Sequence, residues 1–229
     1  MIGFFVQREG NRYMVLRFKE ENYDGKLITF CGLDGSGKTT LINMLDEYLK
    51  NNDITAILTK QPTDSIRNSE MFRTYMDQED HNDYDYRALS LSAAADRIQH
   101  TSKFIVPLLE KGEVVISDRY FYSCLANHRA RGYNDPWIYQ ISEYIQKPDY
   151  AFFVDIDVET AISRVRERKI EKDKYIDTDL QYKLREEYIK IAEDSGGIII
   201  SSNDSVEKCF KKIIKTINFY ANRRSIAKW

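Results

Sequence analysis

The chain has 229 residues, with 34 lysines and arginines against 36 acidic residues and a formal net charge of −2. This length suits one α/β domain with a substantial core, and the nearly balanced charge argues against nucleic acid as a partner. No apolar run approaches transmembrane length, and the N-terminus lacks the basic start and long apolar run of a signal peptide, so we expect no membrane partner.

The N-terminal residues are typical of a β-hairpin. The apolar segments 4–6 and 13–16 flank Glu9-Gly10-Asn11, which suits a Gly-Asn turn. We therefore expect residues 1–25 to form a hairpin extension and residues 26–229 to form the main domain. The hairpin could be a small added sheet or a subunit contact.

A phosphate-binding loop follows the first predicted core strand. Residues 27–31 are a short apolar run typical of a buried strand, and Gly32 to Thr39 spell G-x-x-x-x-G-K-T. Apolar residues then recur at helical spacing from Leu41 to Leu49. A strand, a glycine-rich turn and a helix point several backbone N–H groups and the positive end of the helix at one spot. The predicted triphosphate site comprises Gly32, Asp34, Gly35, Ser36, Gly37, Lys38, Thr39 and Thr40, with Lys38 on the β- and γ-phosphates and the Thr39 hydroxyl on Mg²⁺.

Four further strands alternate with helices along the rest of the chain. The predicted strands are 54–59, 113–117, 150–155 and 197–201, and the predicted helices include 64–78 and 85–110, the latter kinked or ended by Pro107. Apolar residues at helical spacing also mark 180–192 and 206–217. This alternation predicts a doubly wound, five-stranded parallel sheet with helices on both faces.

The cysteines give an expectation about location. Cys31, Cys124 and Cys209 are odd in number and far apart in the sequence. Such spacing is not that of a disulfide framework, and it fits a reducing cytoplasm.

Two acidic residues are candidates for the phosphate chemistry. Asp118 directly follows the strand 113–117, as does the aspartate that holds Mg²⁺ in many phosphate-binding folds, and Arg119 beside it suits a phosphate oxygen. The alternative is an ordinary ion pair at the protein surface. Asp34 lies inside the phosphate loop, where it either faces a cation or a second substrate's hydroxyl, or simply caps the loop.

Two basic clusters are candidates for substrate contacts. Asp96-Arg97 lies on a helix rich in Ala and Leu, where the arginine either binds a ligand or extends to solvent. The second cluster is either a solvated face or a lid, at about 164–177, that closes over a triphosphate. Its basic residues are Arg164, Arg166, Arg168, Lys169, Lys172 and Lys174.

Taken together, these segments resemble the thymidylate kinases. Residues 30–40 resemble the opening of that family, and Ala95-Asp96-Arg97 followed by Asp118-Arg119-Tyr120 is similar to its central block in order and spacing. Ser123 and Ala126 continue the block, and residues 153–157 resemble the family's fourth strand. The resemblance covers roughly residues 26 to 220.

The resemblance implies transfer of the ATP γ-phosphoryl group to dTMP, giving dTDP, with Mg²⁺ and as a homodimer. It places Asp34 at the sugar and metal region, Arg97 at the thymine edge and Arg119 at the acceptor phosphate. Gly35-Ser36 in the loop resembles the subtype whose catalytic arginine comes from the lid. The implied catalytic residues are Asp34, Lys38, Arg119, Arg166 and Arg168, and the implied substrate contacts are Asp34, Arg97, Asp118, Arg119, Ser123 and Asn127, with Thr39 and Asp118 at the metal.

The acceptor side departs from the family pattern. Ala93 stands where the family usually has an aromatic ring that stacks on thymine, unless Tyr75, Tyr84 or Tyr122 replaces it. Asn127-His128 stands where the family often has Tyr-Gln. The alternatives are therefore a related kinase for another monophosphate or nucleoside, or a nucleotide-binding switch without an acceptor, in which Arg97 and Arg119 have no evident use.

Overall fold

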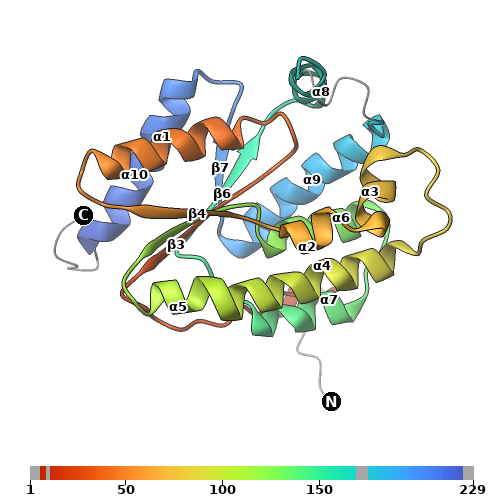
Figure 1. The fold of residues 1–229 in the computed structure, drawn as a ribbon, viewed down its shortest axis with the longest axis horizontal. Helices are drawn as coiled ribbons and strands as arrows, with labels where there is room; N and C mark the ends of the chain where they lie inside the picture. The colour runs from red at the N-terminus through yellow and green to blue at the C-terminus, as the bar shows by residue number, and fades with distance from the viewer. Residues whose placement is uncertain (1–5, 9–10, 169–174, 224–229) are drawn as a thin grey trace.

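A five-stranded parallel sheet forms the centre of the computed structural model, which describes residues 6–8, 11–168 and 175–223. Its strand order is β4-β5-β3-β6-β7, and every adjacent pair is parallel. The strands are β3 (Lys26–Cys31), β4 (Ala56–Lys60), β5 (Val114–Asp118), β6 (Tyr150–Asp155) and β7 (Ile198–Ser201). This confirms the predicted doubly wound sheet (Figure 1).

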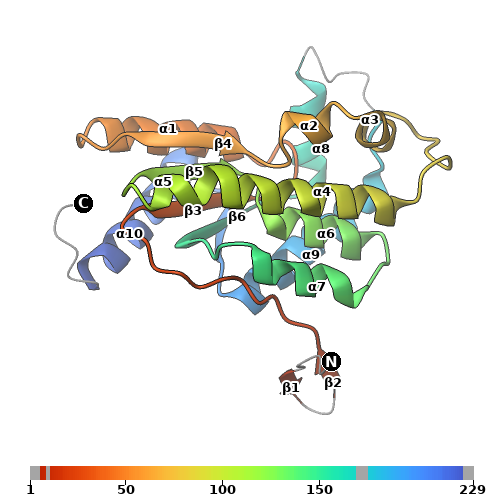
Figure 2. The same cartoon turned by 60° about the horizontal axis from the view of Figure 1, so that its bottom comes forward.

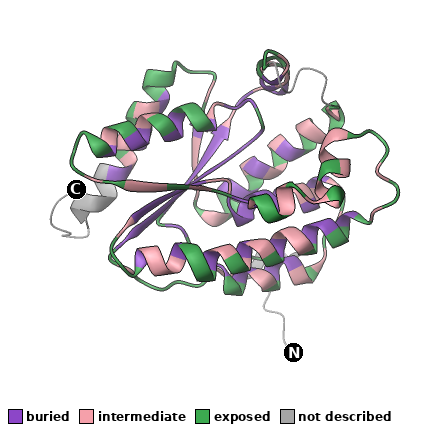
Figure 3. Cartoon of the chain, viewed as in Figure 1, coloured by how far each residue is buried: buried purple, intermediate pink, exposed green. Residues whose placement is uncertain are grey.

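Helices cover both faces of this sheet, as the alternating side chains of β3 require (Figure 3). Ile28 and Phe30 share one core cluster with helices α1 (Lys38–Lys50) and α10 (Val206–Arg223). Within this cluster the Phe30 and Phe152 rings lie 5.2 Å apart. Both faces of the central strand are therefore buried, and only the strand ends can form a site.

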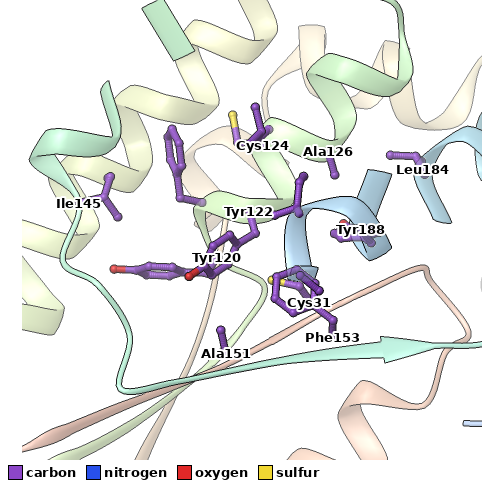
Figure 4. Packing of buried hydrophobic residues seen from close by; sticks show 14 of the residues in the cluster. Cys31, Tyr120, Tyr122, Cys124, Ala126, Ile145, Ala151, Phe153, Leu184 and Tyr188 are labelled. Atoms are coloured by element: carbon purple, nitrogen blue, oxygen red, sulfur yellow. The ribbon is translucent and has the colours of Figure 1, made fainter. Parts of the chain in front are cut away.

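The second core cluster lies on the other face of the sheet and is rich in aromatic side chains (Figure 4). It includes Leu27 and Cys31 from β3 and residues of α4 (Tyr86–His100), α6 (Phe121–Ala130) and α9 (Thr178–Ser195). The Tyr122 and Phe153 rings pack edge to face at 5.1 Å. This cluster holds α4, α6 and α9 in place against the sheet.

The predicted helix at 64–78 is two helices, α2 (Asp64–Arg67) and α3 (Glu70–Asp77). The chain leaves helical geometry at Ser69, whose hydroxyl accepts the Phe72 N–H at 3.3 Å and so starts α3 as an N-cap. The break turns α3 away from the direction of α2 (Figure 2).

The predicted helix at 85–110 passes through a π-helical turn. Residues Thr101–Ile105 join α4 to α5 (Val106–Leu109), and the Val106 N–H bonds to the Thr101 carbonyl five residues back. Pro107 therefore lies two residues into α5, where a missing N–H is tolerated. The remaining helices are α7 (Pro136–Ile141) and α8 (Val158–Arg166), with a 3₁₀ turn at Ser142–Tyr144.

The N-terminal segment has a short antiparallel pair, β1 (Val6–Arg8) and β2 (Asn11–Tyr13), set apart from the main sheet (Figure 2). The expected turn residues Glu9 and Gly10, and Phe4 and Phe5, lie outside the described residues. The expected second strand at 13–16 is wrong beyond Tyr13, because the following residues pack against the aromatic core cluster instead of pairing.

This segment continues as an extended strap between the hairpin and β3. The Arg17 N–H donates to the Ser142 hydroxyl at 2.7 Å, and Lys19 exchanges backbone bonds of 2.8 Å with Ile145 and Lys147. The Phe18 ring packs at 5.1 Å from that of Tyr122.

Among the described helices, none is long and apolar enough to cross a membrane.

Candidate active site

The phosphate-binding loop lies between the end of β3 and the first residue of α1, as predicted. Gly32, Gly35 and Gly37 have φ of 140°, 82° and 93°, a region that favours glycine. A Cβ atom at Gly32 would collide with the Val154 carbonyl, and one at Gly35 with the Ala161 carbonyl. The loop is thus pressed against β6 and α8, which fixes the direction of its N–H groups.

Lys38 lies beneath the loop and is 6% exposed. Its ammonium donates to the Leu33 carbonyl at 2.6 Å and to the Gly32 carbonyl at 3.2 Å. Burial lowers the pKa of Lys38 to about 8, and the nearby Arg119 guanidinium adds to this effect. A phosphate anion above the loop would reverse the shift, so this buried cation is suited to an anionic ligand.

Arg119 is aimed across the loop by an unusual backbone conformation. Its φ is 69°, and its N–H bonds to the Phe30 carbonyl at 2.8 Å. The guanidinium donates to the Asp34 carboxylate at 2.6 Å and to the Tyr188 hydroxyl at 2.9 Å. Asp34 therefore faces a cation, as one of the two expectations held, and in this structure the cation is Arg119.

Asp118 has the surroundings expected of a magnesium-binding carboxylate. One oxygen lies 3.4 Å from the Lys60 ammonium of the neighbouring strand. The other, Oδ1, is buried and has no hydrogen-bond partner within the described part of the chain. A buried carboxylate oxygen left in this state is costly, and oxygen donors are the ligands that Mg²⁺ prefers. The donor set at this strand end therefore fits Mg²⁺, with the exposed Thr39 at the mouth of the same cavity.

A cavity of about 290 Å³ brings most of the predicted residues together. Two of the predicted residues do not line this cavity. They are Ser36, which is buried within the loop, and Arg166, the last residue of α8. The predicted residues that line it are Gly32, Asp34, Gly35, Gly37, Lys38, Thr39, Thr40, Arg97, Asp118, Arg119, Ser123, Asn127 and Arg168.

Arg97 is buried and Asp96 beside it is half-buried, so the alternative in which Arg97 extends to solvent is wrong. Arg97 is 3% exposed and donates to the Ala93 carbonyl at 2.8 Å and the Tyr120 carbonyl at 3.4 Å. Asp96 accepts hydrogen bonds from the backbone N–H of Thr63, at 2.8 Å, and from the Thr63 hydroxyl. It therefore anchors the loop after β4 to α4.

Phe72 supplies an aromatic ring to the cavity that sequence reasoning missed. Ala93 lines the cavity without a ring, as expected, and Phe72 of α3 lines it too. Of the three tyrosines considered as replacements, Tyr122 is 2% exposed within the core, and Tyr75 lines a neighbouring cavity. Tyr84 lines neither of these two cavities. The signal for Phe72 was weak because it depends on where the break between α2 and α3 falls.

The basic residues of the expected lid have different positions. Arg164 of α8 contacts the phosphate loop from the side, with Nη1 3.4 Å from both the Gly35 carbonyl and the Ser202 hydroxyl. Arg168 lines the cavity, as noted above. Lys169, Lys172 and Lys174 lie outside the described residues.

The cavity adjoins a second one of about 720 Å³. Both are lined by Asp34, Tyr86, Asn127 and Arg131, so the two form one continuous depression from the phosphate loop towards α3 and α9. The combined space is of the size in which proteins bind small organic ligands.

Two groups of cations face this depression. Lys38 lies under a loop of the kind that binds a nucleoside triphosphate. Arg97 and Arg119, which are not part of that loop, line the same cavity and could meet a second anionic group there. Fold and cavity together define a P-loop phosphotransferase.

Comparison with known proteins gives the family. The family model for thymidylate kinase matches residues 30–213. A probable thymidylate kinase of Thermococcus kodakarensis is 38% identical over 196 residues, covering 83% of this chain and 96% of the relative. One from Pyrococcus abyssi is 37% identical over 201 residues (84% and 96% covered), and a thymidylate kinase of Clostridium novyi is 33% identical over 198 residues (82% and 96% covered). The chain belongs to the thymidylate kinase family.

Proposed function

We propose that this enzyme transfers the γ-phosphoryl group of ATP to dTMP, giving dTDP. The observation that carries the proposal is that Lys38 of the loop and two further cations, Arg97 and Arg119, line one cavity. A nucleotide-binding switch needs only the first of these groups. The printed names of the relatives support dTMP as the acceptor.

The donor side binds the triphosphate through the loop. Backbone N–H groups of the loop and the N-terminus of α1 point at the phosphates, and Lys38 compensates the charge that grows on them during transfer. Phosphoryl transfer needs alignment and charge compensation, not a protein nucleophile. The buried Lys38, which the carbonyls of Gly32 and Leu33 hold under the loop, meets that need.

The acceptor side has its anion-binding groups already paired. Arg119 binds Asp34 and Tyr188 in this structure, and an acceptor phosphate would take over part of its guanidinium. Asp34 would then accept a hydrogen bond from the sugar. Arg97 at the thymine edge, and Ser123 and Asn127 at the acceptor, remain predictions.

Magnesium completes the proposed donor site. The Thr39 hydroxyl and Asp118 Oδ1, which has no hydrogen-bond partner among the described residues, would hold the ion, Asp118 through water. When bound, Mg²⁺ compensates the charge of the phosphate oxygens. The ion pair with Lys60 holds the Asp118 carboxylate in position.

We further propose that the enzyme is a cytoplasmic homodimer. Leu91 and Ala95 lie one turn apart on the exposed face of α4, and Leu91 and nearby Phe104 are 46% and 40% exposed. Figure 3 shows exposed positions along this outer face of α4, and large exposed apolar residues grouped on one face support a subunit contact. The three buried, unpaired cysteines support a reducing compartment.

The proposed reaction is tested by measuring ADP release with ATP, Mg²⁺ and each common nucleoside monophosphate in turn. We expect dTMP to give the highest kcat/KM. A different preferred monophosphate would support the related-kinase alternative. ATP turnover that no monophosphate stimulates would contradict the kinase proposal and favour a switch.

Replacing the two lid arginines one at a time separates their roles. Arg168 lines the cavity and Arg166 does not, and a guanidinium that compensates transition-state charge is worth ~10²–10³ in rate. We expect Arg168→Ala to lower kcat by about 100-fold, with Arg166→Ala as the matched control within about threefold of wild type. Equal effects in steady-state assays would show that neither arginine is specific to the transferred group.

Replacing Phe72 tests base stacking. Stacking of a base on an aromatic ring is worth about 1–3 kcal/mol, so Phe72→Ala should raise the KM for dTMP about tenfold or more with a smaller change in kcat. Tyr75→Ala is the control, because Tyr75 lines the neighbouring cavity. If the two variants have the same KM, Phe72 is not the stacking ring.

A further inference from the structure

A buried chain of hydrogen bonds leads from the protein surface to the acceptor side of the cavity. The Asp135 carboxylate lies 2.9 Å from His128 Nε2, and His128 Nδ1 lies 3.1 Å from the Ser90 hydroxyl. His128 is 0% and Ser90 1% exposed, whereas the Asp135 side chain is 32% exposed. Ser90 lines the cavity together with Ala93 and Arg97, which lie on the same face of α4.

The chemistry of this chain fixes the direction of each hydrogen bond. An ionised carboxylate only accepts, so the hydrogen of a neutral His128 must lie on Nε2, and Nδ1 must accept. The Ser90 hydroxyl therefore donates its single hydrogen to His128. What the Ser90 oxygen can offer to a ligand is its lone pairs alone.

The surroundings of His128 keep it neutral. Burial lowers the pKa of His128, and the hydrogen bond with Asp135 opposes that effect. From α4, Arg87 also disfavours the charged ring, while the other side chains packed on it are the uncharged rings of Tyr86, Tyr133 and Trp137.

The neighbouring thiol has a closer acceptor for its hydrogen than the Ser90 hydroxyl. Cys124 of α6 lies 3.8 Å from the Ser90 hydroxyl, but its thiol is also placed to donate to the Ser90 carbonyl at 3.6 Å. Burial raises the pKa of Cys124, so it remains a thiol. The Ser90 oxygen thus remains able to accept a hydrogen bond from a ligand in the cavity.

We infer that Ser90 selects the acceptor base by accepting a hydrogen bond from its ring N–H, and that His128 and Asp135 are positioning residues that hold Ser90 in this polarity. The inference rests on the proposed function. Arg97, whose guanidinium reaches back to the Ala93 carbonyl one turn from Ser90, supplies donors beside this acceptor. An acceptor next to donors matches the imide edge of thymine or uracil.

Cytosine does not match this wall. Its ring nitrogen at the corresponding position carries no hydrogen, so two acceptors would face each other. An unpaired buried acceptor is costly, and sites built around such a bond reject ligands that lack the hydrogen. The hydrogen-bond chain Asp135–His128–Ser90 therefore selects pyrimidines that carry an imide N–H.

The first test removes the hydroxyl. Ser90→Ala should raise the KM for dTMP about fivefold to tenfold, the value of one hydrogen bond, and leave kcat within about twofold. The KM for dCMP should not rise, so the preference for dTMP over dCMP in kcat/KM falls. Ser92→Ala is the matched control, because Ser92 is on the same helix and lines neither cavity.

The second test reverses the direction of the hydrogen bond between Ser90 and His128 by changing Asp135, which does not line the cavity. Asp135 lines neither cavity, and in Asp135→Asn the amide N–H₂ group can donate to Nε2, which moves the ring hydrogen to Nδ1. Ser90 then accepts from His128 and turns its own hydrogen towards the base. We expect the dTMP-over-dCMP preference to fall at least tenfold, with a lower KM for dCMP, a change that a purely structural role for Asp135 would not produce.

A third variant gives the conservative rescue. In His128→Asn the amide oxygen can accept the Ser90 hydrogen in place of Nδ1, so more of the preference should survive than in His128→Leu. Folded Ser90→Ala and Asp135→Asn enzymes with the wild-type ratio of dTMP to dCMP would overturn the inference. A wild-type enzyme that is inactive with dTMP would instead overturn the proposed function, and the assay of the wild-type enzyme alone would show this.

Discussion

The site depends on the pairing of β5 with β3 in parallel register. Phe30 lies opposite Asp118, and the Arg119 N–H then bonds to the Phe30 carbonyl, which turns the chain at the edge of the phosphate loop. The positive φ of Arg119 costs of order 1 kcal/mol or more for a residue with a side chain. The Ser117 hydroxyl on the Arg119 carbonyl and Arg97 on the Tyr120 carbonyl stabilise this turn. Because the turn is held from several sides, Asp118 and Arg119 both face the loop.

Charge balance follows from this arrangement. Lys38, Arg97 and Arg119 are largely buried around one cavity, and Asp34 and Asp118 offset only part of their charge. Burying unpaired cations costs desolvation free energy. Tight packing around the loop and in the aromatic cluster offsets that cost. Phosphates of two substrates would supply the missing negative charge. The same buried cations therefore preorganise the site for transfer between two anions.

The sequence predicted the parts of the site that depend on local spacing. The loop motif, the strand ends and Asp118-Arg119 were found because parallel strands bring their carboxyl ends to one edge. The Asp34–Arg119 pair joins residues 85 apart, and Phe72, Tyr188 and Arg164 come from helices whose packing no local pattern reports. The same limit hid the hydrogen-bond chain through His128, which was visible only as a departure from the family pattern. Residues 14–16, at the start of the strap, were mistaken for strand because a short apolar run fits both.

The loop with its buried lysine should drive transfer to dTMP. The most direct measurement is kcat of Lys38→Ala with ATP, Mg²⁺ and dTMP, with circular dichroism and thermal unfolding as controls for the fold. We expect an enzyme that folds as well as wild type and turns over ~10²–10³ times more slowly, since one charge-compensating group is lost. A correctly folded variant within tenfold of the wild-type rate would contradict it.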